Sequence, residues 1–332
     1  MTLFLSTLNQ MGVLGLFIVI GFVIAKLGIV EKGATAMLSK LENNVFLPAL
    51  VLYTFAQNFT AASLSGSWRL LLFSLIAELI VIPIAIFSAK CASKDGFIRR
   101  MYTYGLAFSN FGFMGNAVVQ ALFPAEFYQS YVIFTLPLWT LIYVWGVPGL
   151  LIERSETAEQ SRRGRLLSSL KALINPMFIA LLIGAVIGVS GLGELLFSPG
   201  GGKGIFFTQV VKILGDCMSP IAMMMTGITF AFIDMKRVLS EKSIYAVTAL
   251  RLIAFPLVLG GAAWLVRTYV FPIDGTVFNC FIISLAMPLG LNTIVVPAAY
   301  GRDTSVPAGM ALVSHMLSIA TIPFVMMLFG IG

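Results

Sequence analysis

Long apolar runs alternate with short polar stretches along the whole chain. A helix crosses the hydrocarbon core of a bilayer with about 20 predominantly apolar residues. Ten runs approach or exceed this length, at residues 9–28, 34–58, 66–90, 97–123, 127–152, 173–190, 206–232, 244–268, 275–300 and 306–330. The pattern therefore predicts an all-α polytopic membrane protein with about ten transmembrane helices.

Composition supports this interpretation. Of the 332 residues, 59% are hydrophobic and only 11% are charged, whereas a soluble domain has about 25% charged residues. The first apolar run is not preceded by the basic segment of a cleaved signal peptide, so we expect a retained helix. The net charge of +7 is spread over short loops, which argues against nucleic acid as a partner.

Basic residues predict the orientation of the chain in the membrane. Most of the 21 Lys and Arg residues fall in one set of loops, and the other set holds Arg69, Lys203, Lys212 and Arg267. Cytoplasmic loops are the ones enriched in Lys and Arg. We therefore predict an integral inner-membrane protein of a bacterium, with both termini outside and the polar linker 153–172 in the cytoplasm.

The two halves share polar-to-proline spacings in the same order. The matched pairs are Asn44–Pro48 with Asp216–Pro220, and Glu78–Pro83 with Arg251–Pro256. Five helices is an odd number, so a second copy would enter the membrane from the opposite side, as in many secondary transporters. We predict a first five-helix repeat at 1–152, the linker 153–172, and a second, inverted repeat at 173–332.

Two predicted helices, the fourth and the ninth, are interrupted in the middle. Gly, Pro and Asn there free backbone groups that hydrocarbon cannot satisfy, so a broken helix normally lines a cavity or is buried in protein. Paired breaks in two halves point to a transporter binding site, and ordinary packed kinks are the alternative. The predicted binding residues are Asn110, Gly112, Gly115, Asn116, Pro288, Gly290 and Asn292.

The residue types at the breaks suit an anionic ligand. A neutral amide donates hydrogen bonds to a carboxylate without the desolvation cost of a charge. Glycine lets the backbone approach a ligand closely.

Ionisable residues inside the membrane are costly and rare. Glu78 could carry a proton, and Arg251 could pair with it or with a substrate carboxylate; a fixed structural ion pair is the equal alternative. Asn44 and Asp216 are weaker candidates. We interpret Asn43 and His315 as packing residues.

Other site chemistries lack support in the sequence. Cys91, Cys217 and Cys280 are unpatterned, and the chain has a single histidine, which predicts neither disulfides nor a metal site. The Gly-rich loop 198–204 lacks the spacing of a phosphate loop. We predict no cofactor and no enzymatic activity.

The motifs resemble those of the auxin efflux carrier family, which includes bacterial malate and malonate permeases and plant PIN auxin transporters. The matching stretches are Asn43–Pro48, Asn110–Gly115, Asn175–Pro176, Leu214–Pro220 with Gly227, Arg251–Pro256, and Pro288–Gly290 with Tyr300–Gly301. The resemblance implies ten helices in inverted repeats, with a scaffold of helices one, two, six and seven. It also implies broken helices crossing at the substrate site, elevator motion, a homodimer and organic anion substrates.

The chain departs from the family pattern at three places. Ala117 stands where many relatives have proline, and Ser109 stands where PIN proteins have proline. The linker is also short, so the regulation of PIN proteins is not implied.

The predicted function is secondary active or facilitative transport of small carboxylates such as malate or malonate by elevator-type alternating access. A proton and sodium are the candidate coupling ions, and transport without a coupling ion is the other option. A sodium- or proton-coupled exchanger of similar fold is the first alternative, and a membrane receptor or sensor is the second.

Overall fold

The computed structural model describes residues 2–31, 33–152, 176–197 and 205–331, and within these ranges every predicted apolar run is helical over most of its length. Six helices are long and apolar enough to cross a membrane, and shorter apolar helices accompany them. The prediction of an all-α polytopic membrane protein is confirmed. The linker 153–172, Asn175 and the loop 198–204 lie outside the described residues, and the division into repeats stays a prediction.

The described part of the first half contains eight α-helices and three π-helices. Their bounds are α1 (Thr2–Lys26), α2 (Ala34–Leu41), η1 (Glu42–Phe46), α3 (Leu47–Asn58), α4 (Ala61–Gly66), α5 (Trp68–Ala92), α6 (Gly96–Ala107), η2 (Phe111–Gly115), α7 (Asn116–Leu122), α8 (Ala125–Leu141) and η3 (Ile142–Leu151).

The described part of the second half is also helical. Its elements are α10 (Pro176–Val189), α11 (Leu192–Phe197), α12 (Ile205–Asp216), α13 (Met218–Phe232), α14 (Met235–Leu239), α15 (Lys242–Ala249), η4 (Leu250–Ala254), η5 (Pro256–Gly260), α16 (Gly261–Tyr269), α17 (Gly275–Ala286), α18 (Asn292–Ala299) and α19 (Ser305–Leu328).

Prolines account for two of the wide π-turns. A proline ring clashes with the carbonyl four residues earlier and offers no N–H to it. The carbonyls facing Pro48 and Pro256 belong to Asn44 in η1 and Leu252 in η4. A π-turn shifts the hydrogen-bond register there, so the helix continues past each proline.

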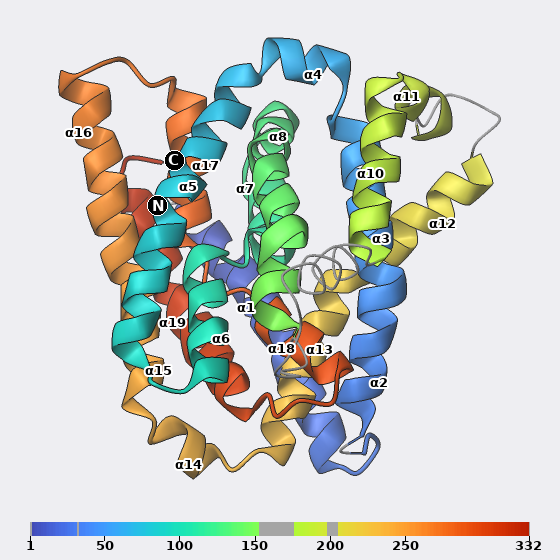
Figure 1. Cartoon of the computed structure of the whole chain (residues 1–332), viewed down its shortest axis with the longest axis vertical. Coiled ribbons are helices and arrows are strands. Elements are labelled where there is room, and N and C mark those ends of the chain that lie inside the picture. Colours follow the sequence, from blue (N-terminus) through green and yellow to red (C-terminus); the bar gives the residue numbers. More distant parts are fainter. Residues whose placement is uncertain (1, 32, 153–175, 198–204, 332) are drawn as a thin grey trace, which may run out of the picture.

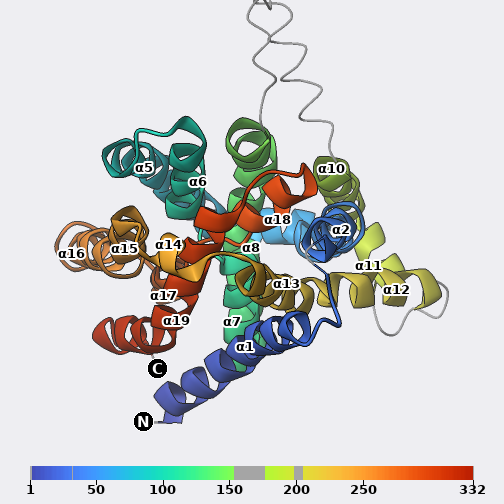
Figure 2. The same cartoon turned by 90° about the horizontal axis from the view of Figure 1, so that it is seen from below.

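The helices form two groups on either side of α8. Figure 2 shows α5, α6, α15 and α16 on one side, and α2, α10, α11 and α12 on the other. On the second side α10 and α12 both pack along α3, and α1 packs along α13. Small residues let the last pair approach closely, because a Cβ at Gly227 would lie 1.9 Å from the Ile18 carbonyl oxygen.

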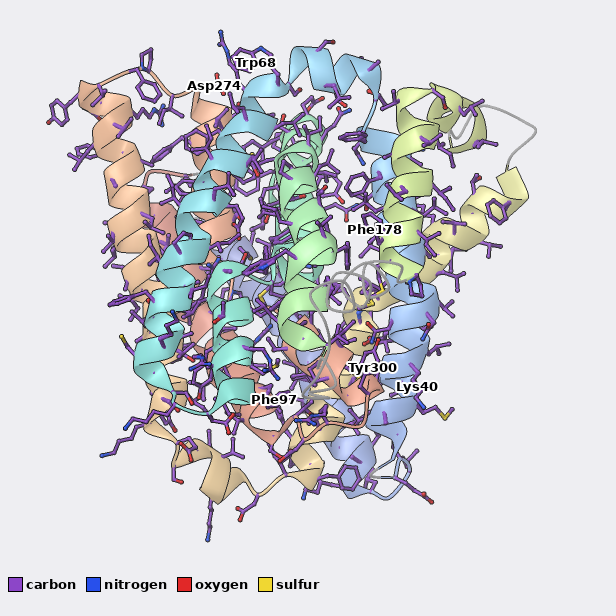
Figure 3. All side chains as sticks on the ribbon, in the orientation of Figure 1. Lys40, Trp68, Phe97, Phe178, Asp274 and Tyr300 are labelled. Carbon is purple, nitrogen blue, oxygen red and sulfur yellow. The ribbon has the colours of Figure 1, made fainter. Side chains whose placement is uncertain are left out.

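The loops gather at two ends of the molecule. The α5–α6 turn and α14 lie at the lower end in Figure 1, while α4, α11 and the α16–α17 loop lie at the upper end. Figure 3 places Lys40, Phe97 and Tyr300 toward the lower end, opposite Trp68 and Asp274. The lower end is the one predicted to be cytoplasmic, and this orientation stays a prediction.

Candidate binding site at two crossing helix breaks

Both predicted interruptions are present, and they touch. Residues 108–110 separate α6 from η2, and residues 287–291 separate α17 from α18. The two breaks form an antiparallel bridge between Ser109 and Leu289. The Asn110 N–H also donates to the Pro288 carbonyl at 2.8 Å. Each break therefore satisfies part of the backbone that the other leaves unpaired.

Gly290 is needed for this close approach. A Cβ at Gly290 would lie 2.8 Å from the Phe108 carbonyl oxygen, within the opposite break. The other two predicted glycines face aromatic side chains of α8 rather than open space. A Cβ would lie 2.3 Å from the Trp139 ring at Gly112 and 2.3 Å from the Tyr131 hydroxyl at Gly115.

Arg251 fastens the two helices that end at the crossing. Its guanidinium donates to the Leu106 carbonyl of α6 at 2.9 Å. It also donates to two carbonyls of the α17 end, Ser284 at 3.0 Å and Met287 at 3.2 Å. The last carbonyls of a helix have no partner within it and carry partial negative charge. A buried cation with a planar fork of donors satisfies three of them at once.

Glu78 lies beside this group without bonding to it. The two charged residues line one small cavity of about 20 Å³, together with Ser74, Ser109 and Ser284, which is room for about one water. Among residues 2–31, 33–152, 176–197 and 205–331, no hydrogen bond or ion pair joins Glu78 to Arg251, and one Glu78 oxygen is buried without a partner. In this conformation the pair is not a direct ion pair.

The amide nitrogens of the two buried asparagines at the crossing are engaged by other side chains. Asn110 Nδ2 lies 2.9 Å from His315 Nε2, and Asn292 Nδ2 donates to the Tyr104 hydroxyl at 2.8 Å. Within the described chain, the Oδ1 atoms of Asn110, Asn116 and Asn292 are buried and have no hydrogen-bond partner. The crossing thus holds amides that are only half satisfied.

His315 belongs to the site although we interpreted it from the sequence as a packing residue. It lies on α19, is 2% exposed, and contacts Asn110 across 205 positions of sequence. The available signal was the general rule that an ionisable residue inside a membrane marks a functional site. Sequence spacing could not have shown which break it would meet.

Aromatic side chains of α8 and η3 were also missed. Trp139 stacks on Tyr143 and meets Phe111 edge-on. Trp139 Nε1 and the hydroxyls of Tyr131 and Tyr143 are buried with no partner in the part of the chain that the structure describes. These donors sit in apolar runs and give no distinguishing signal in the sequence.

The weaker candidates lie away from the crossing. Asn44 is exposed and donates to the Lys40 carbonyl of its own helix. Asp216 is 61% exposed and pairs with Lys212 at 2.6 Å. Asn43 is buried and donates to the Ser39 and Val295 carbonyls, which fits the packing role predicted for it.

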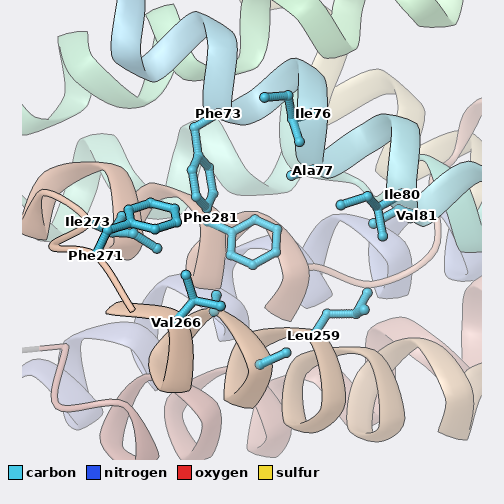
Figure 4. Close-up of a pocket in the computed structure, with 12 residues that line it drawn as sticks. Phe73, Ile76, Ala77, Ile80, Val81, Leu259, Val266, Phe271, Ile273 and Phe281 are labelled. Carbon is cyan, nitrogen blue, oxygen red and sulfur yellow. The ribbon is translucent and has the colours of Figure 1, made fainter. Parts of the chain in front are cut away.

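Two larger openings lie between helices of the described chain. One, of about 540 Å³, lies between α2, α13 and the α18–α19 loop, and polar residues such as Thr229, Asp303 and Ser305 line part of it. The other is an apolar groove of about 220 Å³ between α5, α16 and α17 (Figure 4). The groove shares Ala77, Val81 and Phe281 with the Glu78–Arg251 cavity.

No cluster of three or more His, Cys, Asp or Glu side chains suited to a metal occurs in the described residues.

The sequence model of a protein family described as "Membrane transport protein" matches residues 8–326 of the chain. No curated protein sequence matches the chain.

Proposed function

The chain belongs to the membrane transport protein family, also called the auxin efflux carrier family, and from this premise we propose that it carries small organic anions. The family comprises transporters and not enzymes, as predicted. We propose carboxylates as the substrate class, and the crossing of the two helix breaks as the place where they bind.

The observation that carries this proposal is a set of neutral donors at the crossing, two of which, Trp139 Nε1 and the Tyr131 hydroxyl, have no partner in the described chain. The amides of Asn110 and Asn292, the indole N–H of Trp139 and the Tyr131 hydroxyl lie on or against the two breaks. The helices that start at the crossing, η2 continuing into α7, and α18, add backbone N–H groups and positive dipole ends. Neutral donors suit an anion in a site with little water.

The mechanism we propose is alternating access of the elevator type. The first, second, sixth and seventh predicted membrane helices would form the scaffold. In the structure these are α1, α2 with α3, α10, and α12 with α13, and α1 packs on α13 while α10 packs on α3. The opening of about 540 Å³ lies between scaffold elements and the α18–α19 loop, where a moving unit would separate from the scaffold. An inverted repeat, a homodimer and an inner-membrane location with both termini outside belong to the same proposal.

Ligand-induced stabilisation tests the substrate class. Purified protein is heated with malate, malonate, acetate or indole acetate, each over a range of concentrations. A ligand present at about 100 times its dissociation constant adds about 2.7 kcal/mol to the stability of the protein. Sodium chloride and potassium chloride are the controls. Stabilisation by sodium alone, with every organic acid ineffective, would replace the proposal with a sodium-coupled exchanger.

A further inference from the structure

We propose that His315 is the proton-binding residue of the site. Its protonation turns the Asn110 amide over, so that the amide presents its N–H bonds to the anion instead of its Oδ1 oxygen. The inference rests on the proposed function and adds that a proton is the coupling ion. It would make each bound carboxylate dependent on one proton taken up at His315.

The hydrogen bonds of His315 define its present state. Nδ1 lies 2.7 Å from the Ala311 carbonyl oxygen, which can only accept, so Nδ1 carries a hydrogen. In the neutral ring Nε2 is then an acceptor, and Asn110 Nδ2 donates to it at 2.9 Å. This bond holds Asn110 with its Oδ1 free of any partner in the described chain. An unpaired carbonyl oxygen repels an anion.

A proton on Nε2 reverses the arrangement. The ring becomes an imidazolium that donates from both nitrogens, and Nδ1–H keeps its bond to the Ala311 carbonyl. Nε2–H now requires an acceptor, which Asn110 Oδ1 supplies when the amide turns over about its Cβ–Cγ bond. Both N–H bonds of the amide are then released to the crossing. One proton enters, the hydrogen bond from Asn110 Nδ2 to Nε2 is exchanged for one from Nε2–H to Oδ1, and no covalent bond other than the new N–H is formed or broken.

Charge balance favours the same step. A buried anion is strongly disfavoured without a nearby positive charge. Arg251 is the membrane-embedded cation of the crossing, but its fork is occupied by carbonyls of α6 and α17. The imidazolium supplies a charge that is absent before the substrate arrives and present when it is bound.

The surroundings of His315 contain few competing charges. The elements packed against α19 are α1, α6, α13, α14, α15, α17, α18 and η4. Tyr102 and Tyr104 of α6, Cys280 of α17 and Arg251 of η4 are their buried titratable groups in the described residues. The charged ends of α1, α6, α14 and α15 lie toward the lower end in Figure 1. From η2, the uncharged side chain of Met114 contacts Ser318 of α19, with 4.0 Å between Met114 Sδ and Ser318 Oγ. Within hydrogen-bonding distance of the ring in the described chain lie the Ala311 carbonyl, the Ser314 hydroxyl and the Asn110 amide.

A single histidine makes the proposal directly observable. Protein labelled with 15N-histidine gives the signals of one ring, and we expect the neutral Nδ1–H form in the absence of ligand. Saturating malate, malonate or indole acetate should convert the ring to imidazolium. In weakly buffered solution, an indicator dye should report uptake of about one proton per anion bound. Above the midpoint at which His315 titrates in the ligand-free protein, the apparent dissociation constant of the anion should rise about tenfold per pH unit.

Three variants assign the proton. His315→Gln should bind with no linked proton uptake, while Met316→Leu, on the exposed side of the same helix, should retain uptake of about one proton. Glu78→Gln should also retain it. Loss of uptake in Glu78→Gln with retention in His315→Gln would assign the proton to Glu78 and overturn the inference.

If His315→Gln does not fold, the 15N signal of the histidine ring still tests the proposal, because it is measured on the unmutated protein. An acid that binds while the ring stays neutral refutes the role of His315 and leaves the proposed function intact. If no carboxylate binds at all, the proposed function fails, and the inference fails with it.

Discussion

Replacing Arg251 with lysine keeps the positive charge but removes the planar fork. Arginine reaches the Leu106 carbonyl of α6 and the Ser284 and Met287 carbonyls of α17 at the same time. An ammonium is a compact donor at the end of a flexible stem and cannot reproduce this geometry. It would satisfy one helix end and leave at least one buried carbonyl of the other unpaired.

The expected loss follows from the number of bonds. A hydrogen bond to a charged group contributes about 1.5–3 kcal/mol, and a buried acceptor left unpaired is penalised similarly. Losing one or two of the three bonds in Arg251→Lys should therefore lower the free energy of unfolding by about 2–5 kcal/mol. Arg251→Met loses all three bonds and should be less stable than Arg251→Lys.

Chemical unfolding of purified protein in detergent measures the difference, and Arg267→Lys provides a control near the upper end. The variant Glu78→Gln/Arg251→Met separates the two interpretations of the arginine. If Arg251 chiefly neutralises Glu78, removing both charges should restore most of the stability. We expect little recovery, because the Leu106 and Met287 carbonyls lose their side-chain donor and the Ser284 carbonyl keeps only the Ser109 hydroxyl. Arg251→Lys with parental stability would refute the reasoning.

Other predictions concern the crossing and the orientation. If Asn110 contacts a carboxylate, Asn110→Ala should weaken binding about ten- to a hundredfold by loss of one charged hydrogen bond, and Asn110→Asp should nearly abolish it by like-charge repulsion; parental affinity in both folded variants would show that the amide only packs. Gly290→Ala should destabilise the protein, because its Cβ would lie 2.8 Å from the Phe108 carbonyl oxygen, whereas Gly261→Ala, which meets open space, should not; equal melting temperatures would contradict this. A single cysteine at Gly201 should react with impermeant thiol reagents in intact cells, and one in the linker 153–172 should not; the reverse labelling would invert the assigned orientation.

Local features of the protein were predictable because their causes are local. Apolar runs specify helices in a bilayer, since each helix satisfies its own backbone. Pro288 and Gly290 predicted one break and Asn110 with Gly112 the other, because these residue types disturb a helix wherever it packs. The spacing of Arg251 from Pro256 did not reveal that the arginine would be surrounded by carbonyls.

The functional arrangement was decided by contacts between segments far apart in the chain. Asn110 meets His315 across 205 positions, Arg251 reaches Leu106 across 145, and Asn292 reaches Tyr104 across 188. Hydropathy describes the environment of a residue but not its partner. Only the packing of α19 and η4 against the two breaks brings an imidazole to one amide and a guanidinium to two helix ends. The sequence by itself determined the helices and where they break, whereas the tertiary structure decided which polar groups satisfy the breaks.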